Sequence, residues 1–472
     1  MRKTMMWLMS MALVLGMAGC GNAADSDDHS PAAGGEMAES IQMEVSQAET
    51  ETQNESSTEN ETGAENTDYS DVEFRISWWG GDARNTQTVE IIENFEKRYP
   101  NLKIDVEYGE FGDHFTRLTT QATAGNLPDV YMMDYSKMNE FVNSGQLEQL
   151  DSYMESKTID LSDVDDSFLS GGIVDGGMYA ITTGINAPCF YYDPAVLEEL
   201  NLSLNQAPKW KELIEVIETV YEKTGKQAFM EPNEASLGIY LRSMGKSIYA
   251  EDNTGYGFEP EDLAAYLEIF YNLYESGAAT SSAEYNGEIE TCLQDDSGIW
   301  LKMWEDGFSN SLILNEEQAG KRLSLCTYPS ADETNESGTF LKPTMLWGIS
   351  STSENKELAA AFINYFVNDA FVYDVCGMDR GVPISASMRD HISSAADETE
   401  KYILDFINYL SDGVATAISP AAPTGAAEAD SNIVEVYEQL YYGQLRKEEL
   451  LDAADEAMAQ GNAILAKNAA DK

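Results

Sequence analysis

Two short segments of the sequence combine aromatic and acidic side chains in a way that suits the binding of a polyhydroxylated molecule. They are Trp78-Trp79-Gly80-Gly81-Asp82 and Met133-Asp134-Tyr135. Aromatic rings stack on the apolar C–H faces of sugars, and carboxylate or carboxamide groups bridge neighbouring hydroxyls. If the two segments meet in space, they predict a carbohydrate-binding site.

The individual residues of these segments allow both a binding and a structural interpretation. Trp79 falls on the polar phase of its strand, where packing explains a large ring poorly, so we expect it to face a ligand. Trp78 continues the apolar phase and fits a core position equally well. Asp82 and Asn85 are candidate ligand contacts, and both also suit the cap of the following helix. Asp134 is a candidate hydroxyl acceptor, with a loop or cap role as the alternative.

Further candidates lie elsewhere in the chain. Trp300 and Trp304 are four residues apart on an expected helical turn, where core packing is the default and ligand stacking the alternative. Trp347, Arg380 and Asn186 become candidates through the family resemblance described below. Arg380 would hold ligand hydroxyls or an acidic neighbour, and Asn186 is the weakest of the three.

The elements that position the two segments follow from hydrophobic periodicity. Apolar residues alternate over 72–78 and 102–108, which predicts two strands, and 128–134 reads as a third strand. Apolar residues recur at helical spacing over 89–95 and 115–122. Strand, helix, strand, helix, strand indicates an α/β fold with a largely parallel sheet. In open α/β sheets, ligands bind beyond the carboxyl ends of the strands. Both aromatic and acidic segments stand at such ends.

Several amphipathic helices are expected further along the chain, and no internal repeat at a fixed period is seen. The expected helices cover 209–224, 261–275, 357–366, 400–410 and 432–467.

The N-terminal segment reads as a secretory leader. Arg2 and Lys3 precede an uncharged apolar run over 5–17, which is short for a membrane span. Met17-Ala18-Gly19-Cys20 then resembles a bacterial lipoprotein signal, in which the peptide is cut before the Cys and the Cys carries lipid. The pattern departs from the usual one at Met17, where Leu is commoner. The resemblance implies that residues 1–20 are removed and that Cys20 is lipidated; an ordinary leader with an incidental Cys is the alternative.

The amino-acid composition of the chain disfavours some classes of function. The chain has 83 acidic and 28 basic residues, a formal net charge of -55, so that binding to nucleic acid or to anionic lipid surfaces is disfavoured. Residues 21–70 are rich in Glu, Ser, Thr, Asn, Ala and Gly, which predicts a disordered acidic tether. The whole chain has 472 residues, and the part that follows residue 70 is long enough for two domains.

Signatures of catalysis and metal binding are missing from the sequence. There is no Walker loop, G-x-G-x-x-G, H-E-x-x-H or G-x-S-x-G, and the three histidines have no ligand spacing. Carboxylate pairs for glycoside hydrolysis arise by chance among so many acidic residues. Four cysteines, Cys189, Cys292, Cys326 and Cys376, lack metal-type spacing, and their pairing in an oxidising compartment stays open.

Blocks of sequence spread over much of the chain resemble the family 1 extracellular solute-binding proteins, the maltose-binding-protein-like subunits of ABC importers. No single block is specific, and the assignment depends on their order and spacing. Asn186-Ala187-Pro188 lies where the family varies, and the usual Gly-Pro-Trp is not evident, which leaves the ligand open. The blocks are Phe95–Pro100 with Ile104 and Val106, Leu118–Val130, Asp175–Ile181 with Phe190–Asp193, Trp347–Ser350 with Asn355–Ala359, and Gly381–Pro383.

This resemblance implies a two-lobe, periplasmic-binding-protein-like α/β fold with a ligand cleft between the lobes. It places residues 71–182 and about 349–384 in lobe 1, and 183–348 and about 385–472 in lobe 2. The first crossing between lobes follows residue 181, and Trp347 lies at the second.

The implied function is that of an extracellular solute-binding subunit lipid-anchored at the outer face of the bacterial cytoplasmic membrane. It would capture a small nutrient, most readily an oligosaccharide, and deliver it to ABC permease subunits, without catalysis, cofactor or metal. One alternative is a secreted lipoprotein enzyme acting on polysaccharide. Another is the same binding role for a peptide or polyamine, because rings and carboxylates also suit a cation.

Overall fold

The computed structural model describes residues 68–287, 292–293, 297–304, 312–313, 316, 320–332, 334, 336–416, 418–419 and 422–470. All of them belong to one compact unit. The predicted leader, Cys20 and nearly all of the predicted tether lie outside the described residues. No helix in the described part of the chain combines the length and apolarity needed to cross a membrane.

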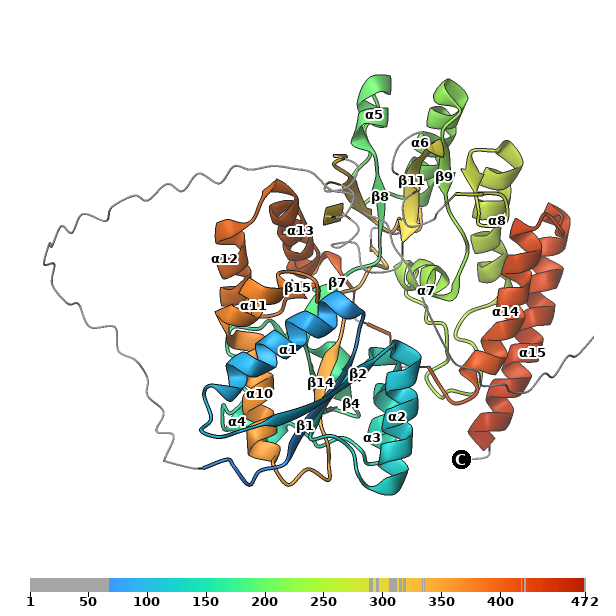
Figure 1. Cartoon of the computed structure of the whole chain (residues 1–472). Helices are drawn as coiled ribbons and strands as arrows, with labels where there is room; N and C mark the ends of the chain where they lie inside the picture. The colour runs from blue at the N-terminus through green and yellow to red at the C-terminus, as the bar shows by residue number, and fades with distance from the viewer. Residues whose placement is uncertain are drawn as a thin grey trace, which may run out of the picture. The chain divides into compact units, whose positions relative to one another are not determined.

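The first sheet has five strands in the order β2-β1-β3-β14-β6 (Figure 1). These are β2 (Ile104–Gly109), β1 (Phe74–Trp79), β3 (Val130–Met133), β14 (Leu346–Ile349) and β6 (Ala180–Thr182). β1 runs parallel to β2 and β3, while β14 runs antiparallel to both of its neighbours. The three strands predicted from the sequence are therefore present and parallel, and each of their ends lies within two residues of the predicted position.

Helices cover both faces of this sheet. α1 (Asp82–Glu96) and α10 (Lys356–Asn368) share one face, where Phe95 packs edge-on against Phe362 with ring centroids 5.3 Å apart. α2 (Phe111–Ala124) covers the other face through the buried Phe115 and Leu118. α2 ends because Gly125 adopts a left-handed φ of 67°, a conformation that glycine takes without steric cost.

The second sheet also has five strands, in the order β10-β9-β11-β8-β12. They are β10 (Ala279–Thr280), β9 (Gln227–Phe229), β11 (Ile299–Trp304), β8 (Cys189–Tyr192) and β12 (Ser324–Thr327). β11 is central and pairs with β9 in parallel and with β8 antiparallel.

The expected helical turn at Trp300 and Trp304 is therefore wrong. Both residues belong to the strand β11. A spacing of four places two residues on one side of a strand as well as of a helix, so the spacing alone does not separate the two. A strand that is covered on both faces carries large apolar residues on each of them, as β11 does except at Lys302, so that little alternation is left to mark it.

A small third sheet holds the segments that connect the two larger sheets. β7 (Gly184–Asn186) follows β6 of the first sheet and precedes β8 of the second, and it lies between β13 (Lys342–Pro343) and β15 (Val382–Pro383). We call these three strands the connecting sheet. Gly184 has no side chain for a steric reason: an added Cβ would lie 2.1 Å from the carbonyl oxygen of Arg380.

The remaining helices surround the two large sheets. α14 and α15 pack against each other and against α8, while α12 and α13 lie beside β15. The lobe boundaries drawn from the sequence stay a prediction. The other elements are β4 (Ile173–Val174), β5 (Gly177–Met178), α3 (Met138–Asn143), α4 (Asp151–Glu155), α5 (Pro194–Leu200), α6 (Trp210–Thr224), α7 (Glu234–Ser243), α8 (Pro260–Ser276), α11 (Ala370–Cys376), α12 (Ala386–Ala395), α13 (Glu398–Tyr409), α14 (Ala426–Tyr441) and α15 (Leu450–Ala470).

Candidate functional site

The carboxyl ends of three parallel strands meet at one edge of the first sheet. The register pairs Trp79 of β1 with Gly109 of β2, and Ser77 of β1 with Tyr131 of β3. The two segments singled out in the sequence therefore lie beside each other, as the strand order predicts. The end of β2, on the other side of β1, adds a third aromatic segment.

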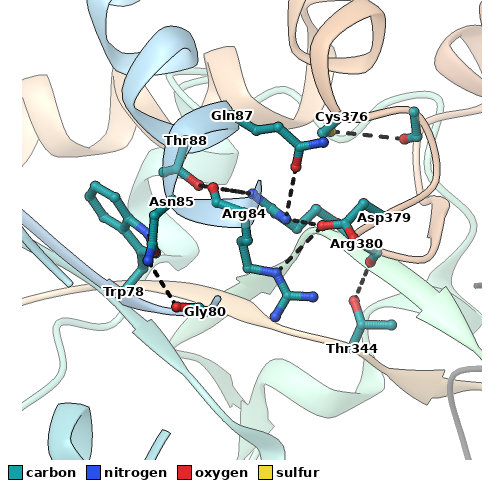
Figure 2. Close-up of polar contacts among 11 residues, drawn as sticks. Trp78, Gly80, Arg84, Asn85, Gln87, Thr88, Thr344, Cys376, Asp379 and Arg380 are labelled. Atoms are coloured by element: carbon teal, nitrogen blue, oxygen red, sulfur yellow. Dashed lines mark hydrogen bonds and ion pairs between the residues drawn. The ribbon is translucent and has the colours of Figure 1, made fainter. Parts of the chain in front are cut away.

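Trp78 is fully buried beneath this edge. Its Nε1 donates a hydrogen bond to Asn85 Oδ1 at 2.9 Å, and Asn85 Nδ2 donates to the Gly80 carbonyl at 2.9 Å (Figure 2). Asn85 thus ties the first turns of α1 to the end of β1. The ring of Tyr108 stacks on Trp78 with centroids 5.1 Å apart and planes 29° apart. Trp78 and Asn85 accordingly support the site from beneath.

Trp79 lies on the opposite face of the sheet in an aromatic cluster. Its ring contacts Phe111, His114 and Phe115 at centroid distances of 5.4 to 5.6 Å. His114 is buried, and its Nε2 makes a hydrogen bond with the Met132 carbonyl oxygen at 2.8 Å. Burial lowers the pKa of His114 to about 4, so the imidazole is neutral at pH 7. Trp79 is 8% exposed, so little of its ring reaches solvent.

The two carboxylates differ in what they contact. Asp134 Oδ1 accepts hydrogen bonds from Ser136 N at 2.9 Å and from Ser136 Oγ at 2.5 Å, which caps the short 3-10 turn Tyr135–Lys137. The cap role weighed as an alternative is therefore present. Asp82 is exposed, and no described residue makes a hydrogen bond or ion pair with its carboxylate.

Trp347 and Trp300, which lie farther along the chain, are packed in the interior. Trp347 is fully buried in β14 and packs edge-on against Phe362 and Phe366 at 5.5 and 5.4 Å. Trp300 is fully buried in the second sheet beside Tyr192. Direct contact between a solute and either ring would require its neighbours to move. The backbone of Trp304 ends β11, while its side chain lies outside the described residues.

Arg380 is buried as well, with 2% of its side chain exposed. Its guanidinium donates to Thr88 Oγ1 at 2.8 Å and to the Arg84 carbonyl at 3.2 Å, and it contacts Asp379 and Gln87. Burial lowers the pKa of this guanidinium to about 10. Of the two roles weighed for Arg380, the structure shows the contact with an acidic neighbour. Asn186, in β7, is 8% exposed.

The structure brings forward two aromatic residues that the sequence reasoning did not select. Tyr108 is 46% exposed and Phe111 is 43% exposed, so their rings are the accessible ones above Trp78 and Trp79. The rule applied to the first and third strands, that ligands bind beyond carboxyl ends, also applied to the second strand and would have found Tyr108.

Among the described residues, neither the cysteines nor the potential metal ligands form a second functional site. Cys189 and Cys326 are free and buried on neighbouring strands, but Cys189 is opposite Thr327 and Cys326 opposite Phe190, so their side chains lie on opposite faces. Burial raises the pKa of both thiols and raises that of Cys376 to about 11. Within the described ranges, no cluster of three or more His, Cys, Asp or Glu side chains suits a metal ion.

Two α/β sheets joined by a connecting sheet define a two-lobe fold of the solute-binding class. The sequence model of the bacterial extracellular solute-binding protein family matches residues 82–371. The chain therefore belongs to the bacterial extracellular solute-binding protein family, a family of binding proteins.

Solved structures share this fold. A family 1 extracellular solute-binding protein from Alicyclobacillus acidocaldarius is 26% identical with a TM-score of 0.71, covering 84% of this chain and 98% of that one. A periplasmic oligogalacturonide-binding protein from Yersinia enterocolitica, in complex with saturated digalacturonic acid, is 23% identical with a TM-score of 0.66. That alignment covers 84% of this chain and 99% of the other.

Relatives matched by sequence align over shorter segments. An arabinooligosaccharide-binding protein from Halalkalibacterium halodurans is 20% identical over 195 residues, which is 40% of this chain and 44% of that protein. The chain spans 29% to 44% of the length of the curated relatives it matches.

Proposed function

We propose that this protein captures an oligosaccharide outside the cell and delivers it to the permease of an ABC importer. The observation that carries the proposal is the aromatic edge at the three strand ends, where exposed Tyr108 and Phe111 lie over buried Trp78 and Trp79. Exposed rings fixed by rings beneath them lose little freedom when a sugar stacks on them. The arabinooligosaccharide-binding relative supports the same class of solute.

The site residues take distinct roles in this proposal. Tyr108 and Phe111 stack on sugar rings, with Trp79 contributing its exposed margin, and Asp82 and Asp134 accept hydrogen bonds from hydroxyls. Trp78, Asn85, Trp347 and Arg380 hold the surrounding elements in place through the contacts described above. Trp304 stays a candidate from the second lobe, on the far side of the proposed cleft.

A solute screen on the full chain tests the function. Thermal unfolding is followed with neutral saccharides, acidic saccharides, peptides and polyamines, because a bound solute raises the apparent stability. We expect stabilisation by saccharides and no change in the saccharide recovered after incubation. Stabilisation by peptides or polyamines alone would show that the solute is not a saccharide. Recovery of a shortened or rearranged saccharide would favour the alternative of an enzyme that acts on polysaccharide.

Replacement of Tyr108 by alanine tests the site itself. Loss of a stacked ring should cost about 1–3 kcal/mol of binding free energy, or about five- to 150-fold in affinity for the saccharide found in the screen. Val106→Ala is the matched control, because Val106 is 37% exposed on the same strand and the same face. Titration calorimetry showing equal affinities for Tyr108→Ala and Val106→Ala would remove the aromatic edge from the site.

The proposal also includes lipid anchoring through Cys20 at the outer face of the cytoplasmic membrane. The leader and the acidic segment over 21–70 support it, and the family is extracellular. A long tether would let the folded body reach its permease while staying at the membrane surface.

A further inference from the structure

We propose that Arg84 contacts the bound solute and selects for a carboxylate on it, so that the solute class is an acidic saccharide of the uronate type. This inference rests on the proposed function, because it places a charged contact in the same strand-end site. It adds a residue that neither the aromatic pattern of the sequence nor the stacking argument supplies.

The position of Arg84 makes direct contact possible. It lies in the first turn of α1, directly after the Gly80-Gly81 end of β1. Its side chain crosses Gly80 so closely that a Cβ on that glycine would be 2.4 Å from Arg84 Cδ. The side chain is 22% exposed, which keeps its end accessible to a solute.

Only one of the three guanidinium nitrogens of Arg84 donates a hydrogen bond to a described residue. Nε is 3.4 Å from Asp379 Oδ2, while Nη1 and Nη2 have no hydrogen-bond partner among the described residues. In Figure 2 the guanidinium extends past Asp379 toward the segment between β13 and β14 that carries Thr344, leaving both terminal nitrogens away from the Arg380 contacts. A planar pair of N–H donors matches a carboxylate in two parallel hydrogen bonds.

The charge balance around Arg84 favours an anionic group. Asp379 Oδ2 serves both Arg84 Nε and Arg380 Nη1, so two guanidinium groups share one carboxylate. The other partners of Arg380, which are Gln87, Thr88 and a backbone carbonyl, are neutral. Among the described residues, the three side chains Arg84, Arg380 and Asp379 therefore keep about one positive charge that a solute carboxylate would neutralise. The nearby exposed carboxylate of Asp82 makes no ion pair with Arg84 and stays available for hydroxyls.

The net charge of -55 acts against the approach of an anion, and this effect has a limited range. At physiological ionic strength, exposed charges farther away than about 8 Å are largely screened, whereas a partly buried pair is screened much less. The local cluster therefore decides the preference once the solute is in place, and the acidic surface mainly slows its arrival.

Titration calorimetry on the full chain with digalacturonate and its dimethyl ester isolates the carboxylate, because the two share one sugar skeleton. We expect the unmodified protein to bind digalacturonate at least about tenfold more tightly than the ester. Arg84→Ala should abolish this preference and lower the affinity for digalacturonate about ten- to 150-fold, with little change for the ester. Arg84→Lys, which keeps the charge and loses the planar pair of donors, should give an intermediate affinity.

Arg98→Ala is the matched control. Like Arg84, Arg98 pairs with an aspartate, Asp369, but it lies just past the C-terminal end of α1. Its replacement removes one charge and one ion pair away from the strand ends, and it should leave both affinities unchanged. Circular dichroism melts of each variant establish that the folded state is retained.

The outcomes separate this inference from the proposed function. Equal binding of acid and ester, a preference retained in Arg84→Ala, or binding of neutral saccharides without digalacturonate would overturn the role of Arg84 and leave a saccharide-binding protein. If no saccharide, neutral or acidic, stabilises the unmodified chain in the thermal screen, the proposed function itself fails, and this inference fails with it.

Discussion

His114 shows how one buried side chain links the candidate site to pH. It lies beneath the Trp79 cluster with no exposed surface, and burial lowers its pKa from 6.5 to about 4. Between pH 4 and pH 6.5, His114 binds a proton more readily in the unfolded chain than in the folded chain. The stabilisation by neutral His114 is therefore complete above pH 6.5 and is lost as the pH falls toward 4.

We predict that the free energy of unfolding falls by roughly 1.4 kcal/mol per pH unit between pH 6.5 and 5 because of His114 alone, and by about 3 kcal/mol in total by pH 4. Urea denaturation at several pH values measures this slope. His114→Gln should lack that part of the slope above pH 5, where most carboxylates do not titrate. His391→Gln, at a partly exposed histidine beside Asp374, should retain it. Equal slopes in the two variants would contradict the prediction.

At single residues, the sequence predicted some features of the candidate site and not others. Alternation identified the opposite phases of Trp78 and Trp79, but it did not show that α2 covers the Trp79 face and buries that ring too. Arg380 was selected for its position beside Gly381, whereas its hydrogen bonds to α1 depend on packing between segments almost 300 residues apart. Contacts over such separations leave no local pattern in the chain.

The connecting sheet contains β7, the strand through which the chain passes from the first large sheet to the second. Its central strand β7 leaves no room for a side chain at Gly184, where a Cβ would lie 2.1 Å from a backbone oxygen that cannot rotate away. We predict that Gly184→Ala lowers the free energy of unfolding by at least about 1–3 kcal/mol, the usual cost of forcing extra atoms into a packed region.

Chemical denaturation of the full chain measures this cost, and Gly112→Ala provides the control. Gly112 lies in the first turn of α2, and a Cβ there meets no atom within 4 Å. That substitution should be neutral or should stabilise by up to about 1 kcal/mol, because alanine favours a helix more than glycine does. A Gly184→Ala protein as stable as Gly112→Ala would show that the connecting sheet adjusts freely.

The order of elements could be read from the sequence more completely than their pairing. The first three strands and two helices, and the helix over 210–224, were predicted because their periodicity is local. The strand β11 was taken for a helical turn because its two tryptophans are four residues apart, a spacing that suits both a helix and a strand. The pairing of β14 with β3 could not be derived from periodicity, since it joins residues more than 200 positions apart in an antiparallel direction.

For the molecule as a whole, the proposed attachment to the membrane depends on Cys20, which lies outside the described residues. We predict that Cys20→Ser shifts the protein from the membrane fraction to the soluble fraction in its native host, because the proposed lipid is attached through the Cys20 sulfur. Fractionation with blotting measures the shift, and Cys376→Ser, at a buried thiol, is the control that should stay with the membrane. Unchanged membrane attachment of the Cys20→Ser chain would remove the lipid anchor from the proposal.

The burial of Cys189, Cys292, Cys326 and Cys376 makes this fold a convenient host for a reporter dye. Maleimides react with accessible thiolates, and a thiol inside a packed core is neither accessible nor readily ionised. In a Cys20→Ser chain, a cysteine introduced at the exposed Ala83 would then be labelled selectively without removal of the four buried cysteines. Because Ala83 precedes Arg84 in the first turn of α1, a fluorophore there would respond to the arrival of a solute, and the protein would report its own ligand by a change in emission.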